Sequence, residues 1–194
     1  EELAKITVVA LDKTGTITRG EPEVTDVLPC LDRRRDRSSS LQETLAVAAG
    51  IERRSQHPLA QAILRHAEAL AITPVVVSDF RSLTGAGAAA RFNNMTVYVG
   101  SPAFFQERLG VSLNGVQETL SRLQGEGKTV VVVGDEQALW GLIAIRDTIR
   151  PNARTAIAAL HAAGVETVVM LTGDNTRTAQ AIAREVGIDA VYAD

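Results

Sequence analysis

A carboxylate, an ammonium group and two hydroxyls follow one another closely near the start of the chain, directly after an apolar run. Residues 6–11 are mostly apolar and partly β-branched, which is typical of a buried strand, and Asp12 comes immediately after them. In an open α/β sheet, ligands bind in the crevice outside the carboxyl ends of the strands. The sequence therefore predicts that Asp12 faces such a crevice.

The residues after Asp12 indicate chemistry on a phosphoryl group. An aspartate can attack phosphorus and carry the group as an aspartyl-phosphate if nearby cations offset the charge. Lys13 supplies a cation, and Gly15 lets the backbone turn sharply. The hydroxyls of Thr14 and Thr16, together with the backbone amides of the turn, can receive phosphate oxygens. An aspartate alone could simply cap the strand, but the whole stretch is much more specific.

A second polar cluster stands at the end of another predicted strand. Thr172, Gly173 and Asp174 lie between an apolar run at residues 165–171 and a helical pattern at residues 175–186. A helix N-terminus has unpaired N–H groups and a partial positive charge, so these residues can form a phosphate site. Asp174 alone could equally be the cap of the helix. We expect this strand to lie beside the strand at residues 6–11.

The heptapeptide from Asp12 to Thr18, DKTGTIT, resembles the phosphorylation motif of P-type ATPases, whose core has the haloacid dehalogenase fold. The resemblance implies that Asp12 is phosphorylated, with Lys13 and Thr14 beside it in the catalytic site. It also implies that Thr172 and Gly173 contact the phosphoryl group, with Asp174 in the same catalytic element. Mg²⁺ would be bound by the Asp12 carboxylate and the Thr14 backbone carbonyl, with carboxylates from elsewhere.

Thr14 also distinguishes between classes of enzyme within this fold. Related soluble phosphatases carry a second aspartate two residues after the nucleophile, where it acts as acid and base. The hydroxyl of Thr14 does not titrate near neutral pH and cannot do that work. The sequence therefore predicts a long-lived phosphoenzyme, as an ion pump needs.

Residues 55–59, SQHPL, resemble the Ser-x-His-Pro-Leu signature of the nucleotide domain in heavy-metal-transporting P-type ATPases. The resemblance implies that His57 and Glu52 meet the adenine of ATP. A neutral imidazole offers a flat surface and one donor, which suits an adenine ring, although a histidine before a helix could also be a surface residue or a cap. The nucleotide is expected to approach the backbone at three glycines, which have no Cβ: Gly85, Gly87 and Gly100.

Asp147 and Arg150 precede a predicted helix that starts with Pro151. Residues 147–151 resemble the hinge element of the family, which implies that Asp147 and Arg150 lie near the bound nucleotide. From the residues alone, an exposed ion pair is an equally good explanation.

Two glycine-rich stretches resemble nucleotide motifs by chance. Residues 125–129, GEGKT, lack the glycine that a P-loop needs five positions before Gly127, and a valine-rich strand follows instead of a helix. Gly85-x-Gly87-x-x-Ala90 has the spacing of a dinucleotide fingerprint, but it runs into a predicted hairpin instead of opening a helix. We therefore predict neither a P-loop nor a Rossmann dinucleotide site.

The order of predicted elements indicates one α/β domain of the haloacid dehalogenase type interrupted by an α+β domain with an antiparallel sheet. The predicted limits are residues 1–25 and 140–194 for the phosphorylation domain and 26–139 for the inserted nucleotide domain. Residues 19–22 are expected to break the chain before an extended piece at 23–28, and residues 32–40 to form a solvated loop.

Within the insertion and across its end at residue 139, periodicity predicts four helical segments and five strands. Ser40 with Glu43 forms a capping-box signature, Ser55 is placed to cap the second helix, and Asn93-Asn94 suits a hairpin turn. The predicted helices cover residues 41–54, 58–70, 102–109 and 115–123, and the predicted strands cover residues 75–80, 86–92, 95–99, 129–133 and 139–145.

Composition adds limits but no further site. The 194 residues are 45% hydrophobic and carry a net charge of −3, which gives no electrostatic case for nucleic acid binding. No apolar run approaches the roughly 18 residues of a membrane span, so a soluble polypeptide is expected. The single cysteine, Cys30, cannot form an internal disulfide, and without a second thiol it is not expected to bind metal.

Together these observations predict the ATP-binding and phosphorylation unit of a heavy-metal P-type ATPase on the cytosolic face of a membrane. ATP would bind in the inserted domain, and hinge closure would bring its γ-phosphate to Asp12 in the presence of Mg²⁺. The expected partners are the transmembrane and actuator domains of the same pump, with this fragment itself monomeric. The metal is left open between copper(I) and zinc or cadmium.

Two alternatives remain at this point: a soluble phosphatase of the same fold, and a module that binds ATP without turnover. The family's later magnesium motif and phosphate-contacting lysine do not occur in these 194 residues. Nucleotide binding by the fragment is therefore expected to survive, with weak phosphorylation from ATP.

Overall fold

The computed structural model describes residues 6–30 and 40–193. Its contacts divide the chain into two compact units. The terminal unit consists of Glu1–Pro22, Ser121–Thr129 and Arg146–Asp194, and the inserted unit consists of Glu23–Leu120 and Val130–Ile145. The strands β2 (Thr18–Pro29) and β7 (Leu139–Ile149) each continue from one unit into the other, so no single residue marks a boundary. The domain limits at residues 25 and 139 stay a prediction.

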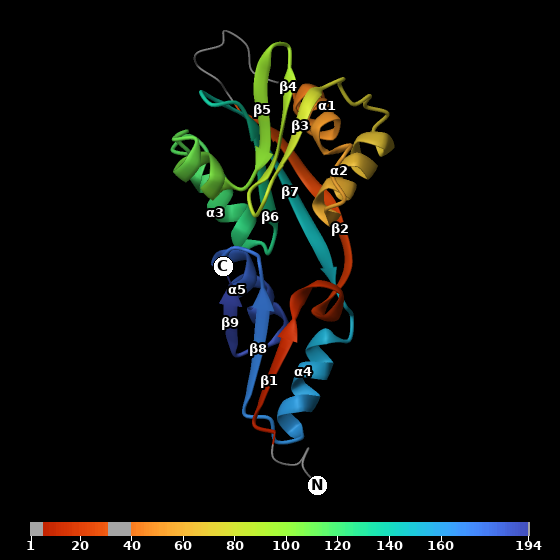
Figure 1. Ribbon diagram of the computed structural model, residues 1–194. Helices are drawn as coiled ribbons and strands as arrows, with labels where there is room; N and C mark the ends of the chain where they lie inside the picture. The colour runs from red at the N-terminus through yellow and green to blue at the C-terminus, as the bar shows by residue number, and fades with distance from the viewer. Residues whose placement is uncertain (1–5, 31–39, 194) are drawn as a thin grey trace. The chain divides into compact units, whose positions relative to one another are not determined.

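The terminal unit is built on a parallel three-stranded sheet in the order β1-β8-β9. Figure 1 shows β8 (Thr167–Thr172) between β1 (Val8–Asp12) and β9 (Ala190–Ala193). The register places Asp12 opposite Leu171. The predicted pairing of the first strand with the strand near residue 170 is therefore confirmed. The third strand, β9, has only four residues and no counterpart among the predicted strands.

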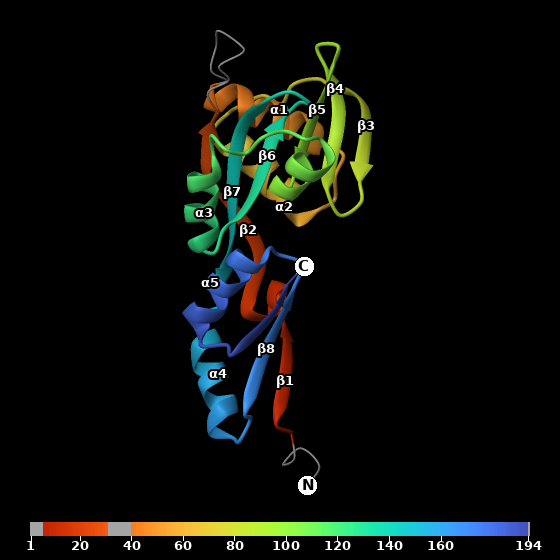
Figure 2. The ribbon, with the colours of Figure 1, turned by 90° about the vertical axis from the view of Figure 1, so that its left-hand side faces the viewer.

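Two helices, α4 (Ala153–Ala162) and α5 (Thr176–Val186), lie on one face of this sheet (Figure 2). The apolar side chains of α5 recur at helical spacing and pack with those of β8. Asn175 caps α5 by accepting a hydrogen bond from Thr178 N, and Gly187 ends it in the left-handed conformation with φ of 83°. The predicted helix at residues 175–186 and its stop at Gly187 are confirmed.

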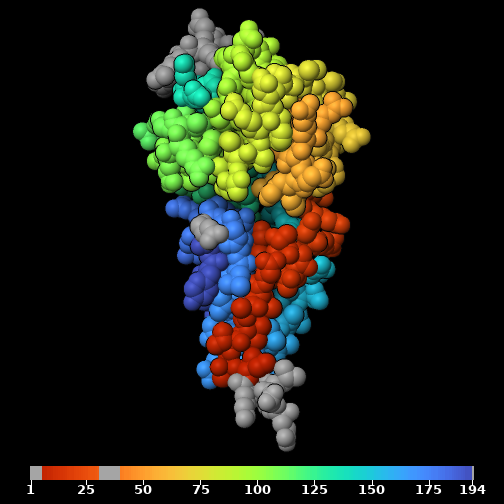
Figure 3. Space-filling view, viewed as in Figure 1, coloured from red at the N-terminus to blue at the C-terminus, as the bar shows by residue number. Residues whose placement is uncertain are grey.

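The opposite face of the same sheet carries apolar side chains that the described residues leave open. Val8, Leu171 and Tyr192 are 57%, 43% and 68% exposed. In the space-filling view, atoms of β1 in red and of β8 in blue lie side by side on the viewed surface (Figure 3). The terminal unit thus has a core on one side of its sheet only, as far as the described residues show.

The inserted unit contains most of a six-stranded sheet in the order β2-β7-β6-β5-β4-β3. Successive pairs from β3 to β6 are antiparallel, as predicted. Asn93 and Asn94 form the turn between β4 and β5 with φ of 47° and 62°, values that suit the twist of a tight hairpin. The bounds not yet given are β3 (Ser78–Leu83), β4 (Gly87–Phe92), β5 (Met95–Gly100) and β6 (Thr129–Gly134).

Helices α1 (Leu41–Glu52) and α2 (Pro58–Ala69) pack on this sheet and enclose a large apolar core. Ser40 Oγ accepts a hydrogen bond from Glu43 N, so the predicted cap of α1 is confirmed. A third helix, α3 (Gln117–Gly125), precedes β6. Neither glycine-rich stretch opens a helix, as predicted. Residues 125–129 lead into β6, which begins at Thr129, and Gly85 is followed by the hairpin of β4 and β5.

Several predicted boundaries are wrong for physical reasons. No break occurs at residues 19–22, because β2 continues through them with Gly20 at φ of 79°. Pro22 is tolerated there because β2 is an edge strand of the sheet. The helix predicted at residues 102–109 is confirmed, since residues 102–108 are helical and Phe104–Arg108 form a π-helical turn. The strand expected at 75–80 begins only at Ser78. The loop predicted at residues 32–40 lies outside the described residues except for Ser40.

Candidate active site

Asp12 is the last residue of β1, and its side chain is exposed at the carboxyl edge of the parallel sheet. The chain then turns through Lys13–Ile17, where Gly15 has φ of 79°. Because β1 and β8 are parallel and in register, Thr172 and Gly173 follow at the same edge. The structure therefore brings the two polar clusters found in the sequence to one edge of one sheet.

Lys13 and Asp174 connect these two clusters through an ion pair. Lys13 Nζ lies 2.6 Å from Asp174 Oδ2, and the side chains are only 10% and 11% exposed. The charge that Lys13 brings to the site is therefore held in one place by a largely buried partner. Asp174 does not cap α5, because Asn175 fills that position. The simpler interpretation of Asp174 as a helix cap is wrong.

Asp174 has two further contacts that hold it in position. Its backbone N donates to Thr172 Oγ1 at 3.1 Å. Its second carboxylate oxygen, Oδ1, accepts a hydrogen bond from Thr129 Oγ1 at 2.9 Å. Because Thr172 Oγ1 accepts from that amide, its own hydroxyl proton stays available for a phosphate oxygen.

Asp147 binds the start of β2, immediately after the turn that follows Asp12. Thr18 Oγ1 donates to Asp147 Oδ2 at 2.6 Å, and the backbone N–H groups of Gly20 and Glu21 donate to Asp147 Oδ1 at 3.1 and 3.2 Å. A carboxylate that accepts several such bonds fixes the backbone around it. Asp147 therefore stabilises the backbone that follows the turn.

Arg150 completes the support of the same turn. Its Nε donates to Thr18 O at 3.1 Å, its Nη2 donates to Gly15 O at 2.9 Å, and its backbone N donates to Ile17 O at 3.0 Å. The exposed ion pair considered from the sequence is therefore wrong, since Asp147 and Arg150 each bind this backbone segment. Their predicted place near a nucleotide stays a prediction.

Glu52 and His57 lie at the junction of α1 and α2 in the inserted unit. Glu52 is the last residue of α1 and is only 7% exposed. Burial raises the pKa of its carboxyl group, and a hydrogen bond with the Ser55 side chain partly offsets that rise. A buried acidic oxygen at a helix junction is unusual, and a partner with an N–H group would stabilise it.

His57, and not Ser55, caps α2. The ring nitrogen Nδ1 accepts a hydrogen bond from Leu59 N at 3.2 Å, so the proton of the neutral ring lies on Nε2. Ser55 Oγ instead accepts from His57 N at 3.3 Å. The predicted role of Ser55 is therefore wrong, and the cap considered for His57 is correct. The cap leaves the exposed ring with an Nε2–H donor, which is compatible with adenine binding.

At two of the three candidate glycines, the packing of the protein itself leaves no room for a side chain. Gly87 and Gly100 are cross-strand partners, and a Cβ on Gly87 would lie 2.0 Å from Val99 O. A Cβ on Gly100 would lie 2.7 Å from Ala86 O. Gly85 differs, because it has φ of 68° and open space around the position of a Cβ. Of the three, Gly85 best matches the expected approach of a ligand to the backbone.

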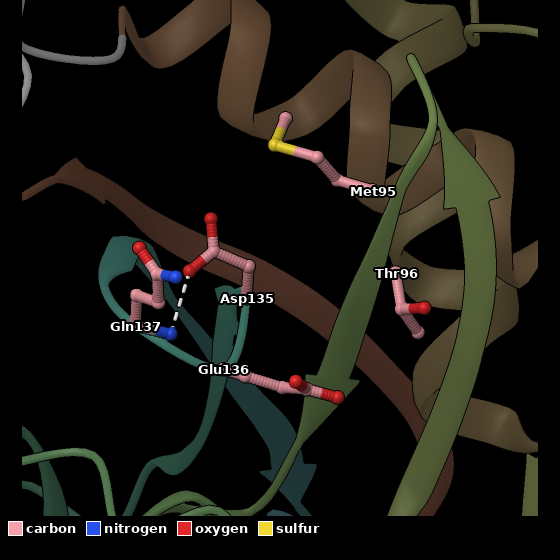
Figure 4. A pocket seen from close by; sticks show the side chains of 5 residues that line it. All are labelled: Met95, Thr96, Asp135, Glu136 and Gln137. Carbon is pink, nitrogen blue, oxygen red and sulfur yellow. Dashed lines mark hydrogen bonds between the residues drawn. The ribbon is translucent and has the colours of Figure 1, made fainter.

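A separate cavity of about 220 Å³ occurs in the inserted unit (Figure 4). Asp135 Oδ1 accepts hydrogen bonds from Gln137 N and Ala138 N at 2.8 and 2.9 Å, and Trp140 Nε1 donates to Asp135 Oδ2 at 3.1 Å. These bonds hold the turn between β6 and β7, so the fold itself explains the buried acid here. The lining residues are Met95, Thr96, Asp135, Glu136 and Gln137.

The described residues contain no group of three or more His, Cys, Asp or Glu side chains that could hold a metal ion. Asp12 and the Thr14 carbonyl offer hard oxygen ligands, and Mg²⁺ commonly binds one or two such protein ligands together with substrate phosphates and water. These residues therefore fit Mg²⁺. Burial raises the pKa of the Cys30 thiol to about 11, which disfavours the thiolate form that binds metals.

Two residues of the site were not singled out from the sequence. Thr18 is fully buried and joins Asp147 to the turn, while Thr129 binds Asp174 from a distant part of the chain. Thr18 ends the recognised heptapeptide, so its place in that stretch was a usable signal. Thr129 gave no such signal, since it stands in the glycine-rich stretch rejected as a P-loop.

Comparison with known proteins now adds to this geometry. A model of the haloacid dehalogenase-like hydrolases matches residues 6–194. The chain belongs to the haloacid dehalogenase-like hydrolase family. It is also 38% identical over 197 residues to a probable cadmium-transporting ATPase of Alkalihalophilus pseudofirmus, with all of this chain and 27% of that protein covered. The chain therefore spans about a quarter of the length of that relative.

Solved structures agree with this assignment. One match is a zinc-transporting PIB-type ATPase in its E2.Pi state, with 37% identity and a TM-score of 0.67. The match covers 99% of this chain and 30% of the zinc-transporting ATPase. The isolated N-domain of a copper-transporting P-type ATPase matches 64% of this chain and 99% of its own, with 27% identity and a TM-score of 0.52. The resemblance to heavy-metal P-type ATPases is thus confirmed. Within the described residues, no helix combines the length and apolar character that crossing a bilayer requires.

Proposed function

We propose that this chain is the ATP-binding and phosphorylation part of a heavy-metal-transporting P-type ATPase and that Asp12 carries the phosphoryl group. The main support is the arrangement at the sheet edge. The exposed carboxylate of Asp12 stands one residue from a lysine whose ammonium is 2.6 Å from Asp174, beside the free hydroxyl of Thr172. A site that combines a carboxylate nucleophile, a fixed cation and phosphate-binding donors suits phosphoryl transfer.

In the proposed reaction, a carboxylate oxygen of Asp12 forms a bond to the γ-phosphorus of ATP. The bond from that phosphorus to the bridging oxygen breaks, and ADP leaves with the oxygen and its electron pair. Lys13 and the amides of the turn offset the charge on the transferred group. Mg²⁺, bound to the Asp12 carboxylate and the Thr14 carbonyl, supplies further positive charge when present. Asp147 and Arg150 keep the turn in place by the backbone bonds described above.

The inserted unit binds the adenosine part of the nucleotide in this proposal. The buried carboxyl group of Glu52 accepts a hydrogen bond from the exocyclic amine of adenine, and the exposed ring of His57 contacts the base. Gly85 offers an open backbone surface. Gly87 and Gly100 contribute by keeping their strands close together.

The phosphoenzyme is expected to persist until another part of the pump removes the phosphoryl group. Thr14 stands where an acid–base residue of a soluble phosphatase would be, and a hydroxyl cannot activate water as a carboxylate does. The chain would work on the cytosolic side of a membrane, together with transmembrane and actuator domains. The cargo would be cadmium, zinc or copper(I); the relatives named above are cadmium-, zinc- and copper-transporting ATPases.

Phosphorylation of the complete pump from ATP labelled with ³²P in the γ-position tests this proposal. Wild type is expected to acquire acid-stable, hydroxylamine-sensitive label, and Asp12→Asn is expected to acquire none. Asp79→Asn is a matched control, because Asp79 has a side chain 62% exposed and a φ of 50° that asparagine also adopts. Label that remains in Asp12→Asn would show that another residue carries the phosphoryl group.

A second measurement separates the pump from a soluble phosphatase. The chain itself is expected to hydrolyse p-nitrophenyl phosphate no faster than its Asp12→Asn variant. Rapid turnover by wild type that is lost in Asp12→Asn would favour the phosphatase.

A further inference from the structure

Asp174 is held by two separate side chains, one on each of its carboxylate oxygens. Oδ2 forms an ion pair with Lys13 Nζ at 2.6 Å. Oδ1 accepts a hydrogen bond from Thr129 Oγ1 at 2.9 Å. The terminal torsion of an aspartate is broad and roughly two-fold, so a carboxylate with one anchor can rotate. With two anchors, its orientation is fixed. The position of the Lys13 ammonium thus depends on Thr129, which reaches Lys13 only through Asp174.

Thr129 is in turn placed by the residues just before it. Lys128 O accepts a hydrogen bond from Thr178 Oγ1 at 2.9 Å, in the first turn of α5. Gly127 has φ of 74°, and a Cβ there would lie 3.3 Å from Ile182 Cγ1 of the same helix. Residues 127–129 therefore pack against α5. They lie next to Asp174, the residue just before the N-cap Asn175. The hydroxyl of Thr129 is presented to Asp174 by this packing and not by chance rotation of a surface side chain.

We propose that Thr129 is a positioning residue for phosphoryl transfer: its hydroxyl orients Asp174 so that Asp174 holds the Lys13 ammonium next to Asp12. This inference rests on the proposed phosphorylation of Asp12. Removing the hydroxyl frees Oδ1 and lets the carboxylate turn, so the ammonium is misplaced when the γ-phosphate arrives. The nucleotide-binding residues of the inserted unit are untouched by that change. Thr129 therefore acts on the rate of transfer and leaves the affinity for ATP as it is.

The test uses the complete pump with Thr129→Val and Thr129→Ser. Valine keeps the shape and β-branching of threonine without the hydroxyl, whereas serine keeps the hydroxyl. Thr129→Val is expected to form phosphoenzyme about tenfold more slowly, as the loss of a hydrogen bond to a charged group implies. The ATP concentration for half-maximal rate should not change, and Thr129→Ser should restore most of the rate. Thr176→Val, which removes an exposed hydroxyl from the first residue of α5, should behave as wild type.

A double-mutant cycle shows whether Thr129 acts through Asp174. In the Asp174→Ala background there is no carboxylate to orient, so adding Thr129→Val is expected to slow transfer no further. Independent, multiplying effects of the two changes would overturn the inference, as would a wild-type rate for Thr129→Val or a raised ATP requirement as its only effect. Asp12→Asn serves as the separate arm. If it keeps its label, the proposed function fails; if it loses label while Thr129→Val stays normal, only this inference fails.

Discussion

The two units hold their candidate functional residues by different forces. In the terminal unit, charged and hydroxyl side chains fix one another and the backbone, as Asp174 does for Lys13 and Asp147 does for the turn after Asp12. In the inserted unit, burial and close packing do this work: Glu52 is 7% exposed, and Gly87 faces the backbone of its neighbouring strand.

This difference matches the chemistry each unit would perform. Charge that develops during phosphoryl transfer has to be met by preorganised charges and dipoles, whereas an adenine needs a shaped apolar surface and few polar contacts. We therefore expect changes of size to act mainly on the inserted unit. Changes that remove one polar atom while keeping shape should act mainly on the terminal unit.

Gly87→Ala is expected to cause the largest loss of stability. Its Cβ would lie 2.0 Å from Val99 O, and the φ of 139° is a conformation that side chains rarely adopt. Overpacking and backbone strain together should lower the free energy of unfolding by about 3 kcal/mol. Urea unfolding followed by Trp140 fluorescence measures it. Gly85→Ala is the comparison variant, since it places alanine at a φ of 68° in the left-handed region without a clash and should lose only about 1 kcal/mol.

Asp147→Ala is expected to have the next largest effect, now in the terminal unit. It leaves the backbone N–H groups of Gly20 and Glu21 without their acceptor and removes the shorter of the two hydrogen bonds of the Thr18 hydroxyl, which keeps Lys13 O at 3.1 Å. The loss should be about 2 kcal/mol in the free energy of unfolding. Thermal unfolding of Asp147→Ala beside Asp79→Asn measures it, with the surface change expected within about 0.5 kcal/mol of wild type. Equal melting curves for all three proteins would contradict the bracing role of Asp147.

His57 allows stability and ligand binding to be separated. His57→Ala removes the cap of α2 and should lose about 1 kcal/mol of stability. His57→Asn replaces it with another good capping residue and should stay near wild type. Both variants lack the imidazole ring, so calorimetry should find ATP binding weakened in both by a similar factor. Wild-type affinity in His57→Asn would exclude the ring from the nucleotide site.

The smallest expected effect is a pH dependence that comes from Glu52. Burial raises the pKa of this carboxyl group in the folded state, so the folded protein binds its proton more tightly than the unfolded chain does. The stability due to this group is fully present below the unfolded pKa and is lost as pH rises through the folded pKa. Urea unfolding measured at pH 4 and at pH 7 gives the change in the free energy of unfolding between the two. The decrease from pH 4 to pH 7 should be smaller for Glu52→Gln than for wild type. An identical fall in both would show that Glu52 titrates normally.

Much of the fold could be predicted because its signals are local. The apolar spacing of α5, its glycine stop and the asparagine turn between β4 and β5 each depend on a few adjacent residues. The errors arose where a distant neighbour changed the local preference. Pro22 indicates a break, but on an edge strand its missing N–H does no harm, so β2 continues.

The sequence by itself determined which residues could react. Asp12 with its lysine and threonines, and Thr172 with Gly173, are recognisable because a nucleophile, a cation and phosphate donors have to be certain residue types at certain spacings. Only the tertiary structure decided how they are held. That Asp174 pairs with Lys13, that Thr129 fixes Asp174, and that Asp147 and Arg150 grip the turn all join residues more than 40 positions apart. Such contacts depend on where the folded chain brings two distant atoms within hydrogen-bonding reach, and no local pattern of residue types encodes that distance.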